Sequence, residues 1–390
     1  MSTAVPPIVH SDRKGHIVEL QSIRGIAAAV VLIGHSLNYF EVEPWFGRYK
    51  DMVNGHSSVV IFFVLSGFVL TQSLMDKPAT LDTTLTFYVR RVFRIYPAIW
   101  IASLVGLIYL LFFHYRIPVG DKTAFELSRF RPDRMKPFFI IASLAGVFTF
   151  LLPQLWTVFV ELIASVIMPP MAFLARRRRA LFWALAVLLG VGSFTLVGFT
   201  PFAVGVYLVD FAIGAAICVL PEAARRLFRM PNWAATVCLV VLAIVLLQFR
   251  LYFDVKYDDP LMQLIEAVCA AAIISFFVHG GATVGVLCSK PMSFLGDISY
   301  SLYLLHYPVL CFVAMGEWLV LQHFGLHISG VLMAVIVAST TFVVTIPLAS
   351  LSYTYVEKPG IRVGSSVVRK LKQMATRRQG LEAPVQPTSV

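Results

Sequence analysis

The sequence predicts an all-α, polytopic integral membrane protein, and three observations point to that fold class. Apolar residues make up 58% of the 390-residue chain and charged residues only 14%, with a mean hydropathy of +0.79. Long apolar runs recur without the strand-by-strand alternation that an outer-membrane barrel would have. The basic residues gather beside these runs, as they do where charge encodes membrane orientation. A soluble globular protein is excluded by this composition.

Ten apolar runs are long enough to cross the hydrocarbon core of a bilayer. They lie near residues 24–40, 57–75, 95–113, 155–175, 180–199, 202–220, 233–250, 261–279, 293–314 and 329–352. A shorter apolar piece, 138–152, follows Pro137 and stops before Pro153, so we expect a re-entrant or interfacial segment there. The sequence thus predicts about ten transmembrane helices and one short additional segment.

Four consecutive arginines at 176–179 determine the predicted topology, because basic runs beside a span favour the cytoplasm. With ten spans, both termini are then cytoplasmic, and the loop of residues 114–136 lies outside. That loop carries six basic residues, Arg116, Lys122, Arg129, Arg131, Arg134 and Lys136. Either the orientation rule, which is statistical, gives way here, or the loop faces an anionic ligand.

Three segments follow from this topology. Residues 1–20 are polar and predict a cytoplasmic N-terminal segment without a cleaved signal peptide. Residues 21–357 form the membrane domain, and Pro359 is expected to end its last helix. Residues 358–390 are basic and poor in apolar surface, which predicts a largely disordered cytoplasmic tail.

The charge and the cysteines exclude several function classes. The formal net charge of +11 does not predict nucleic-acid binding, since Lys and Arg cluster at span ends. The five cysteines lie in or beside apolar runs, and no pair has metal-ligand spacing, so we predict neither a metal site nor a disulfide framework. No phosphate-binding glycine loop, His-Glu-x-x-His motif or Gly-x-Ser-x-Gly elbow occurs.

The first apolar run carries a cation and a titratable ring on one predicted helix face. Arg24 and His35 are eleven residues apart, which at about 100° per residue is three turns plus roughly 20°. Their axial separation is about 16 Å, roughly half of a ~30 Å hydrocarbon core. With Arg24 at the cytoplasmic surface, His35 lies near mid-depth and can accept a proton from a hydroxyl. A topology anchor and a packed histidine remain the alternatives.

Other apolar runs also carry polar groups. Arg91 and Arg94 are helical neighbours that can clamp phosphates or simply orient a helix, and Pro97 fits the first turn of the third span. Glu161 opens the fourth span and needs a cation, a histidine or water within the bundle, in a structural or a catalytic role. Gly67, after Ser66, predicts close helix packing.

The ninth run carries a polar stripe. Ser299, Tyr303 and His306 follow an i, i+4, i+7 pattern with Tyr300 beside them. Hydroxyl groups that hold membrane helices together would explain the stripe, although the second histidine favours a pocket. Isolated polar residues to which we assign no role are Asn54, Asp210, His279 and His323.

Taken together, these segments resemble the membrane-bound acyltransferase family 3. The resemblance rests on Arg24, ten intervening residues and His35, and on five further segments, namely 62–68, 90–97, Trp156 with Glu161, 299–306 and 357–359. The chain departs from the family at Gln21 and Ser22, where an acid and a glycine are common. It departs again at Leu162 and Ser165, where a second acid and a tyrosine are frequent.

The resemblance implies an O-acyltransferase that takes acyl-CoA, most often acetyl-CoA, in the cytoplasm. The acyl group would cross the inner (plasma) membrane to a hydroxyl of a carbohydrate or glycoconjugate. His35 would act as general base or brief acyl carrier, oriented by Glu161 or a tyrosine, so these two residues are the catalytic assignment. The resemblance implies no metal, bound cofactor or nucleic acid, and it leaves the oligomeric state open.

The remaining site residues divide into two groups. The donor would be bound by Arg24, Arg91 and Arg94. The pocket would be lined or supported by Ser299, Tyr300, Tyr303 and His306.

Two other function classes remain open. A proton-coupled transporter, or an exporter of a glycan or lipid-linked precursor, would also use buried His, Glu and Tyr residues. The lack of an internal repeat counts against a carrier built from inverted halves. A non-catalytic membrane assembly factor is the third possibility, and it predicts that a change at His35 leaves all chemistry intact.

Overall fold

The computed structural model describes residues 11–12, 16–50, 52–117, 119–127, 135–195, 204–253 and 259–381. Within these ranges the regular secondary structure is helical, apart from one isolated bridge and a short antiparallel pair, β1 (Ser11–Asp12) and β2 (His16–Ile17), and loops join the elements. The helices of the first half are α1 (Val18–Leu37), α2 (Pro44–Lys50), α3 (Gly55–Met75), α4 (Leu81–Tyr109), the π-turn η1 (Leu110–His114), α5 (Ala124–Leu127), α6 (Pro137–Leu144), α7 (Leu155–Arg177) and α8 (Arg179–Thr195). Those of the second half are α9 (Val204–Cys218), α10 (Glu222–Arg226), α11 (Asn232–Gln248), the 3-10 turn η4 (Phe249–Tyr252), α12 (Pro260–Val278), α13 (Lys290–Asp297), α14 (Ser299–Phe324), α15 (Gly330–Ser352), the π-turn η5 (Tyr353–Glu357) and α16 (Lys358–Leu381).

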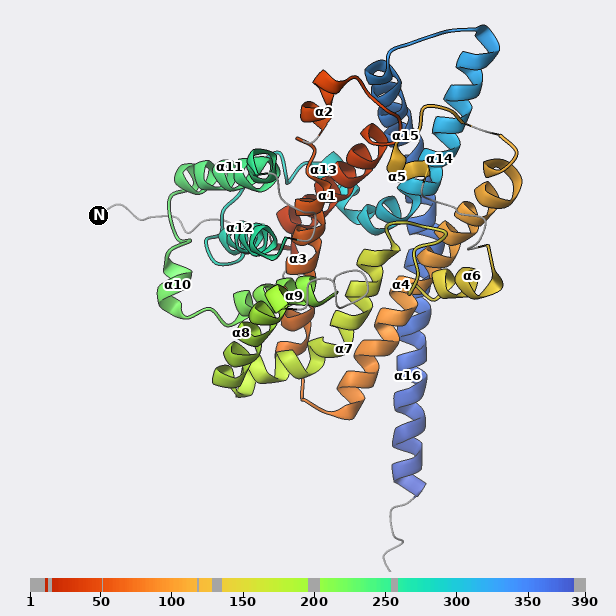
Figure 1. Ribbon diagram of the computed structural model, residues 1–390. Helices are drawn as coiled ribbons and strands as arrows, with labels where there is room; N and C mark the ends of the chain where they lie inside the picture. The colour runs from red at the N-terminus through yellow and green to blue at the C-terminus, as the bar shows by residue number, and fades with distance from the viewer. Residues whose placement is uncertain are drawn as a thin grey trace, which may run out of the picture.

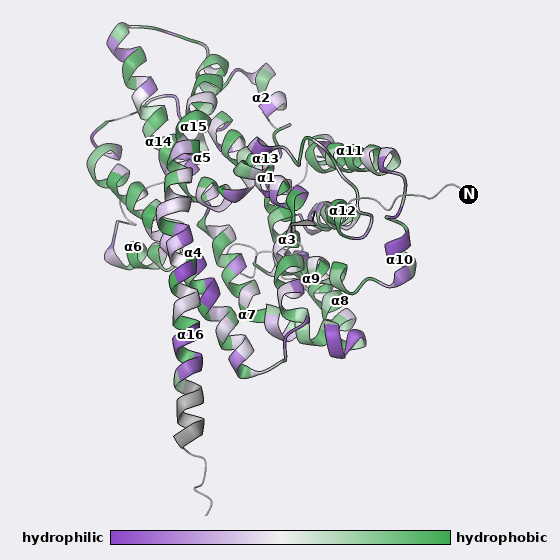
Figure 2. Ribbon diagram, turned by 180° about the vertical axis from the view of Figure 1, so that it is seen from behind, coloured by the Kyte–Doolittle hydropathy of each residue, from purple (hydrophilic) through white to green (hydrophobic). Residues whose placement is uncertain are grey.

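Nine of the ten predicted spans each correspond to one helix, and the ninth in order, 293–314, corresponds to two. Among the described residues, eight helical stretches are long and apolar enough to cross a membrane: Val18–Leu37, Gly55–Met75, Leu81–His114, Leu155–Arg177, Asn232–Tyr252, Pro260–Val278, Ser299–Phe324 and Gly330–Met374. Helices α8 and α9 are apolar but shorter. Apolar residues cover the bundle helices, whereas hydrophilic residues gather on α10 and along α16 (Figure 2). The prediction of an all-α polytopic membrane protein is confirmed.

Several predicted boundaries need correction. Pro97 lies inside α4, because that helix begins about four turns before the apolar run, at Leu81 after the capping side chain of Thr80. The predicted ninth span, 293–314, is divided between α13 and α14 at Ile298. The expectation that the segment 138–152 does not span needs no correction, since only α6 is helical there and its eight residues rise about 12 Å, which is too short to cross a bilayer.

Residues 358–381 are helical, so the prediction of a largely disordered tail is wrong for this part of it. Helix α16 continues α15 through η5, packs against α4 and then extends beyond the bundle (Figure 1). Pro359 does not end the helix. A proline ring normally clashes with the backbone carbonyl four residues earlier, and here that carbonyl belongs to the wider π-turn η5, whose hydrogen bonds follow a different spacing. A Cβ atom at Gly360 would meet the carbonyl of Phe93, so the glycine permits the close approach of α16 to α4. Residues 382–390 lie outside the described residues.

Helices α1 and α3 form the centre of the bundle. Helix α1 packs against α3, α13, α14 and α15, while α3 packs against α7, α9 and α12. Helices α3 and α9 cross closely, because a Cβ at Gly67 would meet the backbone of Phe211 and a Cβ at Gly214 would meet the backbone of Val64. The predicted close packing at Gly67 is confirmed, and α9 is its partner.

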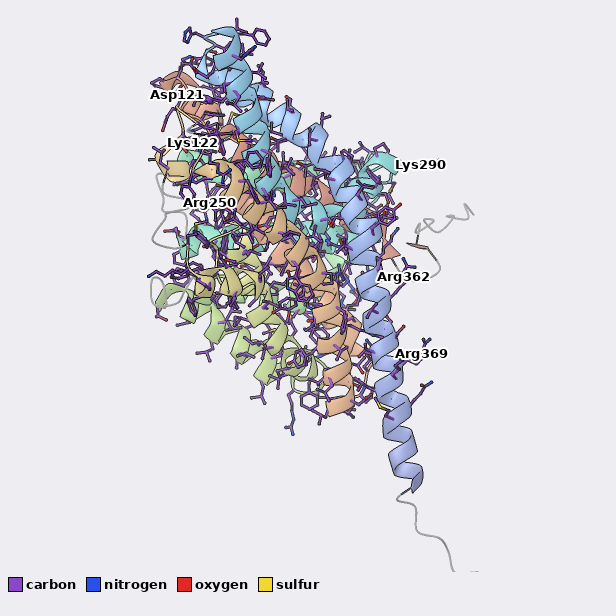
Figure 3. The ribbon with its side chains drawn as sticks, turned by 90° about the vertical axis from the view of Figure 1, so that its right-hand side faces the viewer. Asp121, Lys122, Arg250, Lys290, Arg362 and Arg369 are labelled. Atoms are coloured by element: carbon purple, nitrogen blue, oxygen red, sulfur yellow. The ribbon has the colours of Figure 1, made fainter. Side chains whose placement is uncertain are left out.

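Charged residues mark two opposite sides of the bundle. Asp121, Lys122 and Arg250 lie on one side, whereas Lys290, Arg362 and Arg369 lie on the other (Figure 3). This separation agrees with the predicted topology, which places the first group outside and the second in the cytoplasm. The assignment of the two sides, and of the termini, stays a prediction.

Candidate active site

Two cavities flank α1, and each contains one of the two residues singled out on that helix. The cavity of about 100 Å³ beside Arg24, which we name the arginine cavity, is also lined by Arg91 and Arg94. The cavity of about 1120 Å³ beside His35 is named the histidine cavity. Tyr303 of α14 lines both, as does Val59 of α3. These two side chains therefore belong to the wall that separates the cavities.

The arginine cavity holds an ion pair between α4 and α7. Arg91 Nη2 donates to Glu161 Oε1 at 2.6 Å, and Arg91 Nε donates to Ser165 Oγ at 3.0 Å. The side chains of Arg91 and Glu161 are 11% and 22% exposed, so the pair is mostly shielded from solvent. The sequence analysis expected a cation, a histidine or water beside Glu161, and the structure pairs it with a cation, Arg91.

Cations outnumber carboxyl groups at this cavity. Arg24 lies within the electrostatic reach of Arg94, Glu357, Glu161 and Arg91. Glu357 is buried, and its Oε2 accepts a hydrogen bond from Ser301 Oγ at 3.1 Å. Three guanidinium groups around a half-buried cavity favour an anion with several oxygens, such as a phosphate. Among the described residues, no group of three or more His, Cys, Asp and Glu side chains could hold a metal ion.

Tyr303, in the wall between the cavities, is fixed by hydrogen bonds to α7. Its hydroxyl lies 2.9 Å from Thr157 Oγ1, and Thr157 Oγ1 donates to the carbonyl of Gln154 at 2.9 Å. Gln154 Nε2 in turn donates to the carbonyl of Leu304 at 2.8 Å. The Tyr303 ring also contacts Phe62 of α3, with centroids 5.7 Å apart. The wall is therefore a packed junction of α3, α7 and α14.

His35 lies against α14 at the histidine cavity. Its ring centroid is 5.3 Å from that of His306 and 5.7 Å from that of Tyr307, which meets it edge-on. Tyr307 Oη donates to Glu126 Oε2 at 2.5 Å, so the short helix α5 is tied to the same place. Two consecutive residues of α14 thus support the imidazole of His35.

The structure separates residues that the sequence analysis grouped. His35 and Glu161, the catalytic assignment, line different cavities. Tyr300 lines the arginine cavity and donates its hydroxyl to the carbonyl of Ile95 at 3.1 Å. Ser299 is fully buried and lines neither cavity, and its Oγ has no hydrogen-bond partner among the described residues. The chemical roles of all these residues stay predictions.

A buried polar cluster beside the histidine cavity was missed by the sequence analysis. Glu266 of α12 is bonded to His56 Nδ1 at 2.6 Å, Arg250 Nε at 2.8 Å and Asn54 Nδ2 at 3.0 Å. His56 Nε2 lies 3.0 Å from the hydroxyl of Tyr207. The available signal was Glu266 itself, a carboxylate within an apolar run of spanning length, which needs a partner in the bundle.

The described part of the loop 114–136 borders the histidine cavity. Glu41 N donates to the carbonyl of Asp121 at 2.8 Å, and Thr123 N donates to that of Tyr39 at 3.2 Å. These bonds pair the loop with the chain that follows α1, and Thr123 lines the cavity. Arg129, Arg131 and Arg134 lie outside the described residues, so the two explanations for the basic loop stay open.

Comparisons with known proteins agree with one another. A family described as an acyltransferase domain matches residues 17–350. The chain is 25% identical over 88% of its length to the peptidoglycan O-acetyltransferase OatA of Listeria monocytogenes, of which it spans 56%. It is 23% identical over 95% of its length to nodulation protein 10 of Rhizobium leguminosarum, of which it spans 100%. It is 26% identical over 88% of its length to BcsY of Komagataeibacter xylinus, whose name proposes a membrane-bound transacylase and of which it spans 82%. No solved structure matches the chain.

Proposed function

Because the chain belongs to this acyltransferase family, we propose that it transfers an acyl group, acetyl in the first instance, from cytoplasmic acyl-CoA to a hydroxyl of a carbohydrate acceptor across the membrane. The observation that carries the proposal is the pair of cavities that meet at Tyr303 and Val59. The arginine cavity suits an anion, and the histidine cavity contains His35, the proposed base. A cytoplasmic donor and an acceptor on the far side need such an arrangement.

The donor end of the proposal rests on the arginine cavity. Arg24, Arg91 and Arg94 would meet the phosphates of acyl-CoA, since guanidinium groups bind phosphate oxygens in a bidentate manner. A cavity of about 100 Å³ is smaller than the roughly 300–1,000 Å³ of pockets that enclose a drug-sized ligand. The nucleotide would therefore stay at the mouth, and the acyl-bearing end of the pantetheine arm would reach the wall.

The chemical step would take place at the wall. His35 accepts the proton of the acceptor hydroxyl while that oxygen attacks the thioester carbonyl. The carbon–sulfur bond then breaks, and the CoA thiolate recovers the proton from the imidazolium of His35. Acyl ester and free CoA are the products, and no other reactant is consumed. Glu161 supports this step through Arg91, with which it is paired.

The acceptor end rests on the histidine cavity, whose volume of about 1120 Å³ suits an oligosaccharide. Its lining combines aromatic rings of Trp156, Tyr252 and Phe253 with the amides of Asn38 and Asn54. Apolar faces with a few placed polar groups are typical of small-molecule sites. The name of the Listeria relative specifies peptidoglycan, which makes a surface glycan our proposed acceptor class. The cytoplasmic membrane is the proposed location, because it has acyl-CoA on one side and surface glycans on the other.

A direct assay distinguishes this function from a carrier or an assembly factor. Purified protein in proteoliposomes is given isotope-labelled acetyl-CoA and surface glycan, and CoA release and labelled glycan are measured. We expect His35→Ala to abolish both at an unchanged protein level, whereas His323→Ala, at an exposed site on the end of α14, should match the wild type. Near wild-type acyl transfer by His35→Ala would refute the assignment of the base. Solute uptake without acyl transfer by the wild type would refute the enzyme proposal.

A further inference from the structure

His306, whose ring lies beside that of His35, has one buried ring nitrogen without a hydrogen-bond partner among the described residues. The residue is 0% exposed, and its Nδ1 lies 2.6 Å from the backbone carbonyl of Tyr303. A carbonyl oxygen can only accept a hydrogen bond, so Nδ1 carries the proton and Nε2 carries the lone pair. This Nε2 is buried and has no hydrogen-bond partner among the described residues. A buried acceptor without a donor costs free energy and calls for an explanation.

Three described rings lie near His306, and their hydrogen bonds and distances favour one of them as the donor to that nitrogen. The Tyr303 hydroxyl is paired with Thr157, and the Tyr307 hydroxyl donates to Glu126. The ring of His35, at a centroid distance of 5.3 Å, is nearer to His306 than the rings of Tyr303 at 5.7 Å and Tyr307 at 6.5 Å. An N–H of His35 is therefore the donor best placed to reach Nε2.

We propose that His306 is the positioning residue for His35, accepting an N–H of the His35 imidazole at Nε2 when the substrates are bound. This inference rests on the proposed function. The ring separation in the structure is wider than a hydrogen bond, but catalytic hydrogen bonds are commonly long without substrate and shorten in the complex. The chain of groups then runs from the Tyr303 carbonyl through His306 and His35 to the acceptor hydroxyl.

This arrangement sets the direction of proton transfer. With one nitrogen of His35 donating to His306, the other holds its lone pair toward the histidine cavity, where it accepts the hydroxyl proton. The imidazolium that forms is stabilised by the lone pair of His306, as a carboxylate does in a Ser-His-Asp triad. The proton passes from His35 to the CoA thiolate, and His306 remains neutral throughout.

A neutral partner suits the location of the site. A carboxylate buried within membrane-spanning helices would need a paired cation or solvent, and the described acids nearby already have partners, Arg91 for Glu161 and Tyr307 for Glu126. An imidazole whose tautomer is fixed by a backbone carbonyl supplies the same lone pair without a charge. Among the described residues, the titratable rings in contact with His306 are those of His35 from α1 and of Tyr303 and Tyr307 from its own helix.

Two substitutions separate positioning from packing. His306→Phe keeps an aromatic ring and loses the acceptor, whereas His306→Gln keeps a carbonyl acceptor and an N–H donor for the Tyr303 carbonyl. We expect kcat of His306→Phe to fall about 10²–10⁴-fold with the KM for acetyl-CoA within about threefold of wild type. His306→Gln should recover most of that loss. The matched control is His279→Phe, since His279 also bonds a backbone carbonyl, that of Ile217 at 2.9 Å, but lies outside both cavities.

The pH dependence gives a readout that packing alone would not change. The acidic limb of the kcat profile should shift in His306→Phe and not in His279→Phe, because the partner of the His35 imidazolium has been removed. Nitrogen chemical shifts of ¹⁵N-histidine in the wild type should also report a neutral His306 protonated at Nδ1, which tests the inference even where a variant fails to fold.

Three results would overturn the inference. These are an Nε2-protonated His306, a His306→Phe enzyme with wild-type kcat and pH profile, and equal losses in His306→Phe and His306→Gln. Its failure is distinguishable from failure of the proposed function. Should the wild type transfer no acyl group, or His35→Ala remain active, the function itself is wrong. Should the wild type be active, His35→Ala inactive and His306→Phe unimpaired, only the role of His306 is wrong.

Discussion

Glu266 holds together three residues that line the histidine cavity, Asn54, His56 and Arg250. Its side chain is 1% exposed and accepts hydrogen bonds from His56, Arg250 and Asn54 at 2.6, 2.8 and 3.0 Å. The substitution Glu266→Gln keeps the shape and removes the charge. Arg250, which is 13% exposed, would then face a neutral amide in a poorly solvated place.

The expected loss is about 3–5 kcal/mol in the free energy of unfolding, because removing one member of a buried ion pair leaves the other charge uncompensated. Unfolding temperature falls by about 2–4 °C per kcal/mol in domains of 150–250 residues, and by less in a larger chain. We therefore expect a decrease of about 3–10 °C, measured by thermal unfolding of the purified protein in one detergent. The matched control is Glu222→Gln, whose partner Arg229 lies at 2.7 Å with both side chains at least 50% exposed. That change should cost no more than about 1 kcal/mol.

A double-mutant cycle determines whether the loss belongs to the pair. Arg250→Met alone should also destabilise, but Glu266→Gln with Arg250→Met should cost about 1–3 kcal/mol less than the sum of the two. The reasoning is refuted by a Glu266→Gln protein as stable as the Glu222→Gln control. Strict additivity of the two changes would refute it equally.

Two further predictions concern packing and capping. Gly214→Val should separate α3 from α9 and lower the yield of folded protein, because the added side chain would meet the backbone of Val64. Gly316→Val is the control and should be tolerated, since nothing lies within 4 Å of a Cβ there. Equal yields of the two variants would contradict the close crossing. The pKa of Glu43 is lowered by hydrogen bonds from its own amide and from those of Val331 and Gly330 at the start of α15. A lowered carboxyl pKa stabilises the fold above the ordinary value of 4.5, and this contribution is lost as the pH falls through the lowered pKa. At neutral pH the unfolding temperature of Glu43→Gln should therefore lie below that of the wild type, and in acid the two should become equal. A difference that is the same at both pH values would contradict this account. Glu41→Gln, at an exposed site, is the control.

Local properties of the sequence predicted the helices well. Every one of the ten apolar runs is helical over most of its described residues, because a span must be apolar over its own length and needs no information from elsewhere in the chain. Gly67 likewise predicted a close crossing, since a glycine in an apolar helix permits backbone approach whatever the partner is. The errors at Pro97 and Pro359 arose because the effect of a proline on a helix depends on its surroundings and not on the local sequence alone. A proline is compatible with a helix interior where neighbouring turns widen or neighbouring helices pack, and the sequence does not reveal either condition.

Partners distant in sequence account for what was missed at the site. The bond between His56 and Glu266 joins residues 210 positions apart, and that between Arg91 and Glu161 joins residues 70 apart. The requirement for a partner could be predicted from one buried charge, whereas the identity of the partner depends on which helices are neighbours. The catalytic pairing of His35 with Glu161 was an inference about neighbours of this kind, and the structure places the two residues at different cavities.

Helix α14, more than α1, aligns the two ends of the proposed transfer. Tyr300 lines the arginine cavity, Tyr303 lines both cavities, and Tyr307 and His306 contact His35. These residues span two helical turns, about 10 Å along the axis, so one rigid element spaces the arginine cavity, the wall and His35. Since residues of one helix cannot move independently by more than small amounts, any displacement of α14 toward one cavity alters the other. We therefore expect binding of acetyl-CoA at the arginine cavity to change the environment of His35, which the ¹⁵N-histidine chemical shifts of His35 and His306 would report with acetyl-CoA and without an acceptor; unchanged shifts at saturating acetyl-CoA would contradict this link.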